Sequence, residues 1–159
     1  MQIQIVSVGN LKEKYLKDAV AEYVKRLSRY CKVTINEVSE EKVPETLSDA
    51  EKEQALRREA DRIRNALFKN TFTVVLDLKG KQPDSLEFSK LLSSWMLQGK
   101  SSISFVIGGS IGLDRQLAKE ADYSLCLSNL TFPHQLTRVI LLEQIYRCFK
   151  IMNNETYHK

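Results

Sequence analysis

The fold of this chain is predicted by residues 72–109, FTVVLDLKGKQPDSLEFSKLLSSWMLQGKSSISFVIGG. The first seven of these residues and the stretch 102–109 are rich in apolar side chains, which is typical of strands covered on both faces in a parallel sheet. Between them, Asp84 and Glu87 form a capping pair for a helix over Ser85–Leu97. This order of elements favours a three-layer α/β domain with a mostly parallel sheet.

The alternation of strand and helix continues on either side of this unit. Ser48 begins a strong helix signal, because its hydroxyl can accept from the Glu51 amide while the Glu51 carboxylate reaches back. A chain of 159 residues, 43% of them hydrophobic, can bury one core, so residues 1–159 are expected to form a single domain. We expect further strands at residues 3–8, 32–38 and 123–128, and further helices at 15–27, 48–68, 113–120 and 134–152.

The composition argues against a membrane-spanning, secreted or metal-binding protein. No run approaches the roughly 18 apolar residues that cross a bilayer, and the first residues lack the pattern of a secretory signal, so a cytoplasmic location is expected. Cys31, Cys126 and Cys148 are odd in number and far apart, and the chain has only 2 histidines. We therefore expect reduced, mostly buried thiols and no metal site.

The net charge of +4 is compatible with an anionic partner but does not establish one. Acidic residues cluster between positions 37 and 53, whereas basic residues gather near the C-terminus, which is where a nucleic acid would bind. The helix expected at 48–68 is so charged that a solvated outer helix is the first interpretation, with RNA contact through its arginines as the alternative. These arginines are Arg57, Arg58, Arg62 and Arg64, and the C-terminal basic residues are Arg138, Arg147, Lys150, His158 and Lys159.

Three loops follow strands at the sheet edge where α/β proteins bind ligands, namely 76–81, 108–112 and 127–134. The glycines of GGSIG at 108–112 fit either a tight turn or a ligand cradle. In the third loop, Leu130 and Phe132 either lie buried under the last helix or form an apolar slot for a planar ring. No dinucleotide fingerprint, phosphate loop or nucleophile elbow is present, so covalent or hydrolytic catalysis is poorly supported.

The last third of the chain carries a family pattern. FVIGGSIG, LSNLTFPHQLTRVILLEQIYR and the terminal YHK together resemble the ribosomal RNA large subunit methyltransferase H family of the SPOUT superfamily. The resemblance covers the whole chain, and its most specific part is the spacing of a few residues near the end. These are Pro133, His134, Arg138, Glu143, Gln144, Tyr146 and Arg147.

This resemblance implies a SPOUT, or α/β knot, fold in which the C-terminal segment forms a deep trefoil knot that binds the methyl donor S-adenosylmethionine. Periodicity alone would predict an ordinary doubly wound sheet, because knots are rare exceptions to chain topology. The resemblance also implies a homodimer, with each site completed by the partner subunit, and no metal. The donor-binding residues that it implies are Leu76, Gly108, Leu127, Ser128, Asn129, Leu130, Thr131 and Phe132.

The substrate that the resemblance implies is N3 of a pseudouridine, position 1915 in helix 69 of 23S ribosomal RNA, on assembled ribosomes. Arg147 would stabilise charge on a base carbonyl oxygen, Tyr157 would stack on or orient the base, and His158 would accept the proton or hold a phosphate. Simpler roles stay open. Arg147 can clamp phosphate only, His158 can be disordered, and His134 can merely start a helix. Glu143 can be a structural partner or a base.

Two other functions stay open on the residues alone. A nucleotide-cofactor oxidoreductase would use the same loops, but it should show GxGxxG near Gly9, which is not present. A non-catalytic ribosome-binding factor would use the basic tail and would have no affinity for S-adenosylmethionine.

Overall fold

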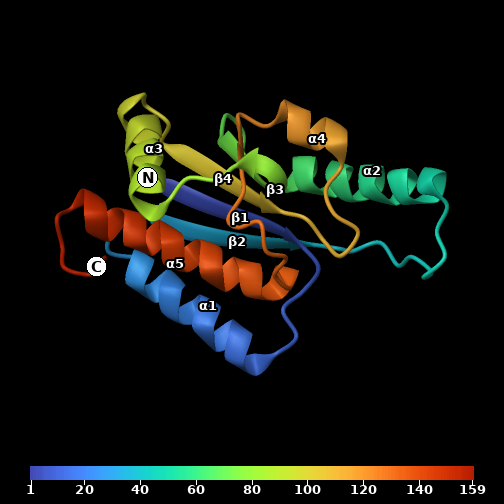
Figure 1. Ribbon diagram of the computed structural model, residues 1–159, viewed down its shortest axis with the longest axis horizontal. Coiled ribbons are helices and arrows are strands. Elements are labelled where there is room, and N and C mark those ends of the chain that lie inside the picture. Colours follow the sequence, from blue (N-terminus) through green and yellow to red (C-terminus); the bar gives the residue numbers. More distant parts are fainter.

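Five parallel strands form one sheet, in the order β2-β1-β4-β3-β5, in this computed structural model of residues 1–159 (Figure 1). Helices α1, α3 and α5 cover one face of the sheet, and α2 and α4 cover the other. The expected three-layer α/β architecture is confirmed, and every strand pair is parallel. In chain order the elements are β1 (Gln2–Val8), α1 (Lys14–Leu27), β2 (Lys32–Val38), α2 (Asp49–Ala66), β3 (Phe72–Lys81), α3 (Ser85–Leu97), β4 (Ser102–Ile107), α4 (Arg115–Glu120), β5 (Tyr123–Leu125) and α5 (His134–Met152).

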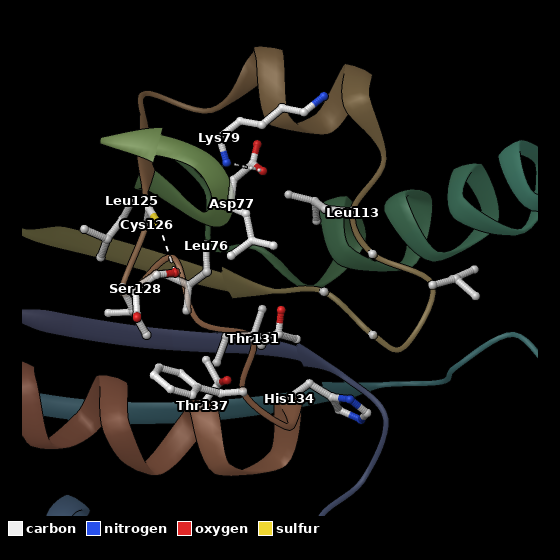
Figure 2. Close-up of a pocket in the computed structure, with 18 of the residues that line it drawn as sticks. Leu76, Asp77, Lys79, Leu113, Leu125, Cys126, Ser128, Thr131, His134 and Thr137 are labelled. Carbon is white, nitrogen blue, oxygen red and sulfur yellow. Dashed lines mark hydrogen bonds between the residues drawn. The ribbon is translucent and has the colours of Figure 1, made fainter. Parts of the chain in front are cut away.

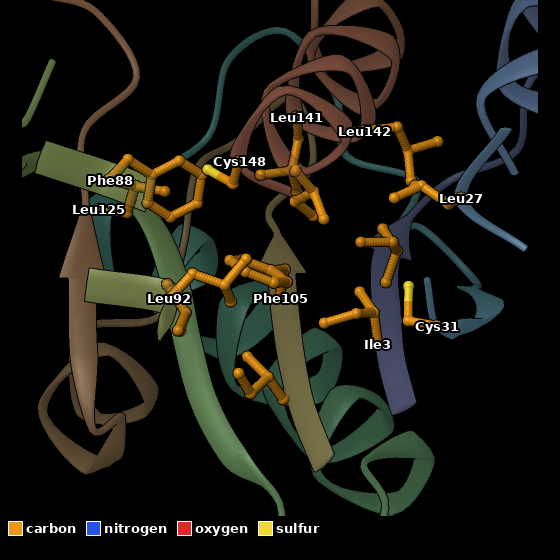
Figure 3. Packing of buried hydrophobic residues seen from close by; sticks show 14 of the residues in the cluster. Ile3, Leu27, Cys31, Phe88, Leu92, Phe105, Leu125, Leu141, Leu142 and Cys148 are labelled. Carbon is orange, nitrogen blue, oxygen red and sulfur yellow. The ribbon is translucent and has the colours of Figure 1, made fainter. Parts of the chain in front are cut away.

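The central strands bury side chains on both faces, as the sequence predicts. In β4, Phe105 packs into the larger core with α1, α3 and α5, whereas Val106 packs into the smaller core beneath α2 and α4. Figure 3 shows Phe105 near Leu92 of α3 and Leu141 of α5. Strand side chains alternate between faces, so a continuous apolar run needs a helical layer on each side.

Helix starts follow the capping signals. Asp84 accepts a hydrogen bond from the Glu87 amide at 2.8 Å, and the Glu87 carboxylate accepts one from the Asp84 amide at 2.8 Å, which completes the box expected for α3. At α2, Ser48 accepts from the Glu51 amide at 3.2 Å. The Glu51 carboxylate, however, accepts from the Ser48 hydroxyl and not from its amide.

Strand β3 runs past its expected end. Leu76 and Lys81 both lie opposite Leu125 of β5, because the residues between them bulge out of the ladder. Gly80 allows the chain to return, since a Cβ there would lie 2.6 Å from the carbonyl oxygen of Ser124. The bulge carries part of the loop at 76–81 to the carboxyl edge of the sheet.

Strand β5 is shorter than expected and ends at Leu125 instead of residue 128. After the Cys126 amide donates to the Lys81 carbonyl at 2.8 Å, the chain leaves the sheet. It then runs across the carboxyl ends of the strands toward the start of α5 (Figure 1). The third predicted loop is therefore a crossing segment between one edge of the sheet and the last helix.

Helix α2 is an outer helix, as the first interpretation of its charge predicts. Arg58 and Arg62 both form ion pairs with Glu41, and Arg64 forms one with Glu120. The three cysteines are free and buried, as expected. None of the helices combines the length and apolar character needed to span a membrane.

Arg138 of α5 is almost completely buried, with 1% of its surface exposed. The prediction that it is available to bind a nucleic acid is therefore wrong. Its guanidinium donates to the Glu37 carboxylate at 2.5 Å and to the Gly9 carbonyl at 2.7 Å. The same carboxylate accepts from the Leu11 amide at 2.9 Å. Arg138 therefore ties α5 to the segments that follow β1 and β2.

Replacing Arg138 tests how much its side chain contributes to the free energy of unfolding. We expect Arg138→Ala to lower the free energy of unfolding by about 3 kcal/mol, because it removes a large, fully buried side chain and leaves a cavity in its place. Arg57→Ala removes a pair at 3.8 Å whose side chains are 70% and 69% exposed, and it should change the stability very little. Urea unfolding at one fixed protein concentration measures both variants. Equal effects would contradict the role of Arg138.

Candidate donor-binding cavity and C-terminal cationic cluster

A cavity of about 530 Å³ lies at the carboxyl ends of β3, β4 and β5 (Figure 2). Its walls come from the three loops that the sequence singles out, together with the first residues of α5 and parts of α2 and α4. Half of the 22 lining residues are hydrophobic. Both the size and this mixed lining fall within the range of small-molecule sites.

Seven of the eight residues that the resemblance implies for donor binding line this cavity. They are Leu76, Gly108, Leu127, Ser128, Leu130, Thr131 and Phe132. Asn129 is exposed and is not among the lining residues. The structure thus brings together three loops that are separated by up to 56 positions in the sequence, between residues 76 and 132.

The glycine turn at 108–112 is shaped by close backbone packing. A Cβ on Gly108 would lie 2.6 Å from the carbonyl oxygen of Gly112, and one on Gly109 would lie 2.9 Å from Val8. Gly112 has a φ of +98°, in the left-handed region that favours glycine. The turn is therefore both a tight turn and a wall of the cavity, and Gly108 is required by the turn itself.

The crossing segment supplies an apolar wall. Leu130 is 70% exposed, which rules out the alternative in which it lies buried under the last helix, and it lines the cavity together with Phe132. The Ser128 hydroxyl accepts from the Leu130 amide at 3.0 Å, which fixes the local turn. These contacts favour the interpretation of this loop as an apolar slot.

Asp77 is the one carboxylate in the cavity lining. It accepts from Arg115 at 2.8 Å and from the Lys79 amide at 3.2 Å. Burial acts to raise the pKa of Asp77, but the hydrogen bond from Arg115 and its charge outweigh burial, so the pKa lies below its ordinary value. Asp77 is therefore ionised at neutral pH.

The three residues predicted to be catalytic meet in a cluster on α5 and the C-terminal tail. The Arg147 guanidinium lies 4.7 Å from the centre of the Tyr157 ring and 3.2 Å from Nδ1 of His158. Glu143 forms an ion pair with Arg147 and accepts from the Tyr157 hydroxyl at 3.1 Å. Glu143 is thus a structural partner of both side chains.

Electrostatics fix the protonation of this cluster. Burial, followed by the negative charge of Glu143, raises the pKa of Tyr157 to about 12, so its phenol stays protonated and acts as a hydrogen-bond donor. The hydrogen bond to Glu143 raises the pKa of Arg147. The cluster therefore presents a permanent cation beside an aromatic ring.

The tail is fastened to the fold by Glu155. Its carboxylate accepts from Lys150 at 2.6 Å and from the Tyr30 hydroxyl at 2.8 Å. Lys150 also lies 5.5 Å from the centre of the Tyr146 ring. These contacts place Tyr157 and His158 against α5.

Cavity and cluster lie at opposite ends of α5 within one chain. His134, the first residue of α5, lines the cavity, and Arg147 follows thirteen positions later. At about 1.5 Å per residue, the two ends of this segment are about 20 Å apart along the helix axis. The structure therefore does not bring Arg147, Tyr157 and His158 to the cavity of the same chain.

Sequence reasoning missed the cavity residues that come from helices, which are Lys52 and Leu56 of α2, Arg115 of α4 and Thr137 of α5. Thr137 follows His134 by three positions and so shares its helix face, a signal that could have identified it. For Lys52 and Leu56 no local signal exists, because their position depends on how α2 packs on the sheet. No group of three or more His, Cys, Asp or Glu side chains forms a candidate metal site.

Comparisons with known proteins identify relatives of this chain. A family model described as "Predicted SPOUT methyltransferase" matches residues 1–158. Proteins named ribosomal RNA large subunit methyltransferase H from Acetivibrio thermocellus, Ruminiclostridium cellulolyticum and Clostridium kluyveri are 54%, 55% and 54% identical over 159 residues, which is the full length of both chains in each case.

A solved structure with a similar fold is that of a probable methylase family protein from Haemophilus influenzae. It matches with a TM-score of 0.51 at 15% identity. The match covers 96% of this chain and 66% of that one, and it supports the fold alone.

The packing of the glycine turn predicts a local effect of Gly108→Ala. The added methyl group must displace the Gly112 carbonyl, so amides at 109–113 should exchange hydrogen at least about ten-fold faster, a change of about 1.4 kcal/mol in local opening. Gly99→Ala is the control for strain at a distant glycine: a Cβ there meets nothing within 4 Å, and the strain from its φ of +83° falls on the turn after α3 and not on residues 109–113. Exchange at 109–113 that is the same in both variants would show that Gly108 does not shape the turn.

Proposed function

Because this chain belongs to the SPOUT methyltransferase family, as the match over residues 1–158 and the full-length relatives establish, we propose that it methylates 23S ribosomal RNA with S-adenosylmethionine. The target that we propose is N3 of the pseudouridine in helix 69, on the assembled ribosome. The observation that carries the proposal is the cavity formed by the three loops at the carboxyl ends of the strands. A ribosomal substrate also supports a cytoplasmic location, which we propose with it.

The residues of the cavity fit the proposed donor. Leu76, Leu127 and Phe132 provide apolar surface for an adenine ring, and the turn at 108–112 and the crossing segment provide backbone donors and acceptors. The charge of Asp77 is already balanced by its ion pair with Arg115, and Lys52 and Lys79 in the same lining can hold the carboxylate of the donor. When bound, S-adenosylmethionine supplies an electrophilic methyl group on a sulfonium, which N3 takes as the carbon–sulfur bond breaks and the N3 proton is released.

We further propose that the crossing segment makes a deep trefoil knot. It leaves the sheet at β5, on one edge, whereas α5 is tied by Arg138 and Glu37 to the ends of β1 and β2, at the other edge. Between these two points the segment shares a cavity with the loops that follow β3 and β4. A chain that passes between those two loops is consistent with the family's knot.

The separation of the cavity from the cationic cluster supports a shared active site. The two lie about 20 Å apart along α5, so a complete site requires the cluster of one protomer beside the cavity of its partner. A two-fold symmetric dimer provides two such sites at once. The surface formed by α1 and α5 offers apolar side chains for such a contact, since Tyr15 of α1 is 69% exposed and Leu136 of α5 is 38% exposed.

In the shared site, the cluster would act on the base. Arg147 is held by Glu143 as a fixed cation that can stabilise negative charge on a base carbonyl oxygen as N3 loses its proton. Tyr157 can stack on the base or donate a hydrogen bond, but it cannot accept the proton at neutral pH, since its pKa is raised to about 12. We propose the imidazole of His158 as the proton acceptor, because the Glu143 carboxylate is already engaged by Arg147 and by the Tyr157 hydroxyl.

Locating the methyl group tests the proposed activity. Purified protein, labelled S-adenosylmethionine and ribosomes from cells that lack this protein should give label in the helix 69 loop, found by mass spectrometry of RNA fragments. Free 23S RNA should be a poor acceptor, because a domain with a net charge of only +4 binds RNA weakly without the ribosome. Equal methylation of both substrates, or label outside that loop, would reject the substrate assignment.

Mixing two inactive variants tests the shared site. Gly108→Ala damages the cavity and Arg147→Ala damages the cluster, so each homodimer should be inactive. After co-expression, half of the dimers should be mixed and contain one intact site each, which restores about a quarter of the wild-type activity. Absence of any restoration, with mixed dimers demonstrated by native mass spectrometry, would contradict a site built from both protomers.

A further inference from the structure

The tip of the glycine turn is attached to the rest of the protein by one side chain, that of Glu40. Glu40 Oε1 accepts from the Ser110 hydroxyl at 2.7 Å and from the Ser110 amide at 3.2 Å. The turn also closes on itself through the Gly112 amide and the Gly109 carbonyl, 3.1 Å apart, but that bond does not leave the turn. Glu40 thus provides the hydrogen bonds that tie the tip to another segment.

Two glycines make room for this carboxylate. A Cβ on Gly9 would lie 3.4 Å from Glu40 Oε2, and one on Gly109 would lie 3.2 Å from Oε1. The hydrogen bond from the Ser110 hydroxyl is the largest cause that lowers the pKa of Glu40, so the carboxylate is ionised at neutral pH. Hydrogen bonds to an ionised acceptor are stronger than neutral ones.

The segment that carries Glu40 is itself anchored to α2. The neighbouring residue, Glu41, forms ion pairs with Arg58 and Arg62, and its amide donates to the buried Glu59 carboxylate at 2.8 Å. The same helix lines the cavity with Lys52 and Leu56. Glu40 therefore connects two walls of the cavity, the glycine turn and α2.

We propose that Glu40 is a positioning residue for the methyl donor, which holds the turn at 108–112 in the shape that binds it. This inference rests on the proposed function. Glu40 and Ser110 do not line the cavity, whereas Gly108, Gly109, Ile111 and Gly112 do. A tether outside the cavity lowers the cost of ordering the turn when the donor binds, which improves affinity without any contact to the reacting atoms.

The test compares four variants of the full-length protein by calorimetry with S-adenosylmethionine and by methylation of ribosomes. Glu40→Ala should weaken donor binding about five-fold, and Ser110→Ala should weaken it less, because the Ser110 amide still donates to Glu40. The double variant should be no worse than Glu40→Ala, because the contact that Ser110→Ala removes is part of the one that Glu40→Ala removes. Glu40→Gln should recover most of the affinity, since its amide oxygen still accepts. The rate at saturating donor should stay within about two-fold of wild type, because Glu40 acts on binding.

Glu45→Ala is the matched control, since it removes another exposed carboxylate of the same segment that forms no ion pair. It should leave donor affinity unchanged. Hydrogen exchange at 109–113 in the donor-free protein gives a separate readout, with faster exchange expected in Glu40→Ala and not in Glu45→Ala.

The inference is overturned if Glu40→Ala binds the donor like wild type, if the Glu40 and Ser110 effects multiply, or if Glu45→Ala has the same effect. A loss of rate at saturating donor with unchanged affinity would also overturn it. Failure of the proposed function is distinguishable, because the wild-type protein would then bind no donor at all.

Discussion

The buried guanidinium of Arg138 fixes where the last helix lies, and the site depends on that position. Arg138 reaches from α5 to Glu37 and to the backbone carbonyl of Gly9, so the end of the chain is tied to the segments after β1 and β2. A charge buried to this extent is stable only with such partners. Because α5 cannot move away, the residues between β5 and α5 must cross the carboxyl ends of the strands.

This crossing produces the cavity. Leu127 to Phe132 line the cavity together with the bulge of β3 and the glycine turn. Gly80 permits the close approach of β3 to Ser124 of β5, and Gly108 lets the turn close on the Gly112 carbonyl. The same helix carries the cationic cluster at its far end. One element therefore positions both parts of the proposed chemistry, and a symmetric dimer is the simplest way to unite them.

Much of this could be predicted from local sequence, because the signals involved are local. The apolar runs at 72–78 and 102–109 predicted buried parallel strands, and Asp84 with Glu87 predicted the start of α3. The end of β3 could not be predicted, because Lys81 rejoins the sheet only when β5 is present to receive it. Arg138 was misjudged for a similar reason, since its partners Glu37 and Gly9 are more than 100 positions away.

The loops of the site could be identified from strand ends and glycines, but their assembly could not. The contribution of α2 through Lys52 and Leu56 depends on tertiary packing, and the distance between the cavity and Arg147 follows from the length of α5. The family and the expected cofactor came from resemblance and not from periodicity. The sequence left open whether the glycines at 108–112 make a tight turn or a ligand cradle, and the structure shows that the Gly112 carbonyl by itself requires a glycine at position 108.

The central claim is that the cavity between the glycine turn and the crossing segment holds the methyl donor. A crystal structure of the protein soaked with S-adenosylmethionine tests this most directly. The account predicts density for the donor against Leu76, Gly108 and residues 127–132, with the tail of the partner subunit nearby. A cavity that is empty and closed by its own side chains, or a donor bound elsewhere, would contradict it.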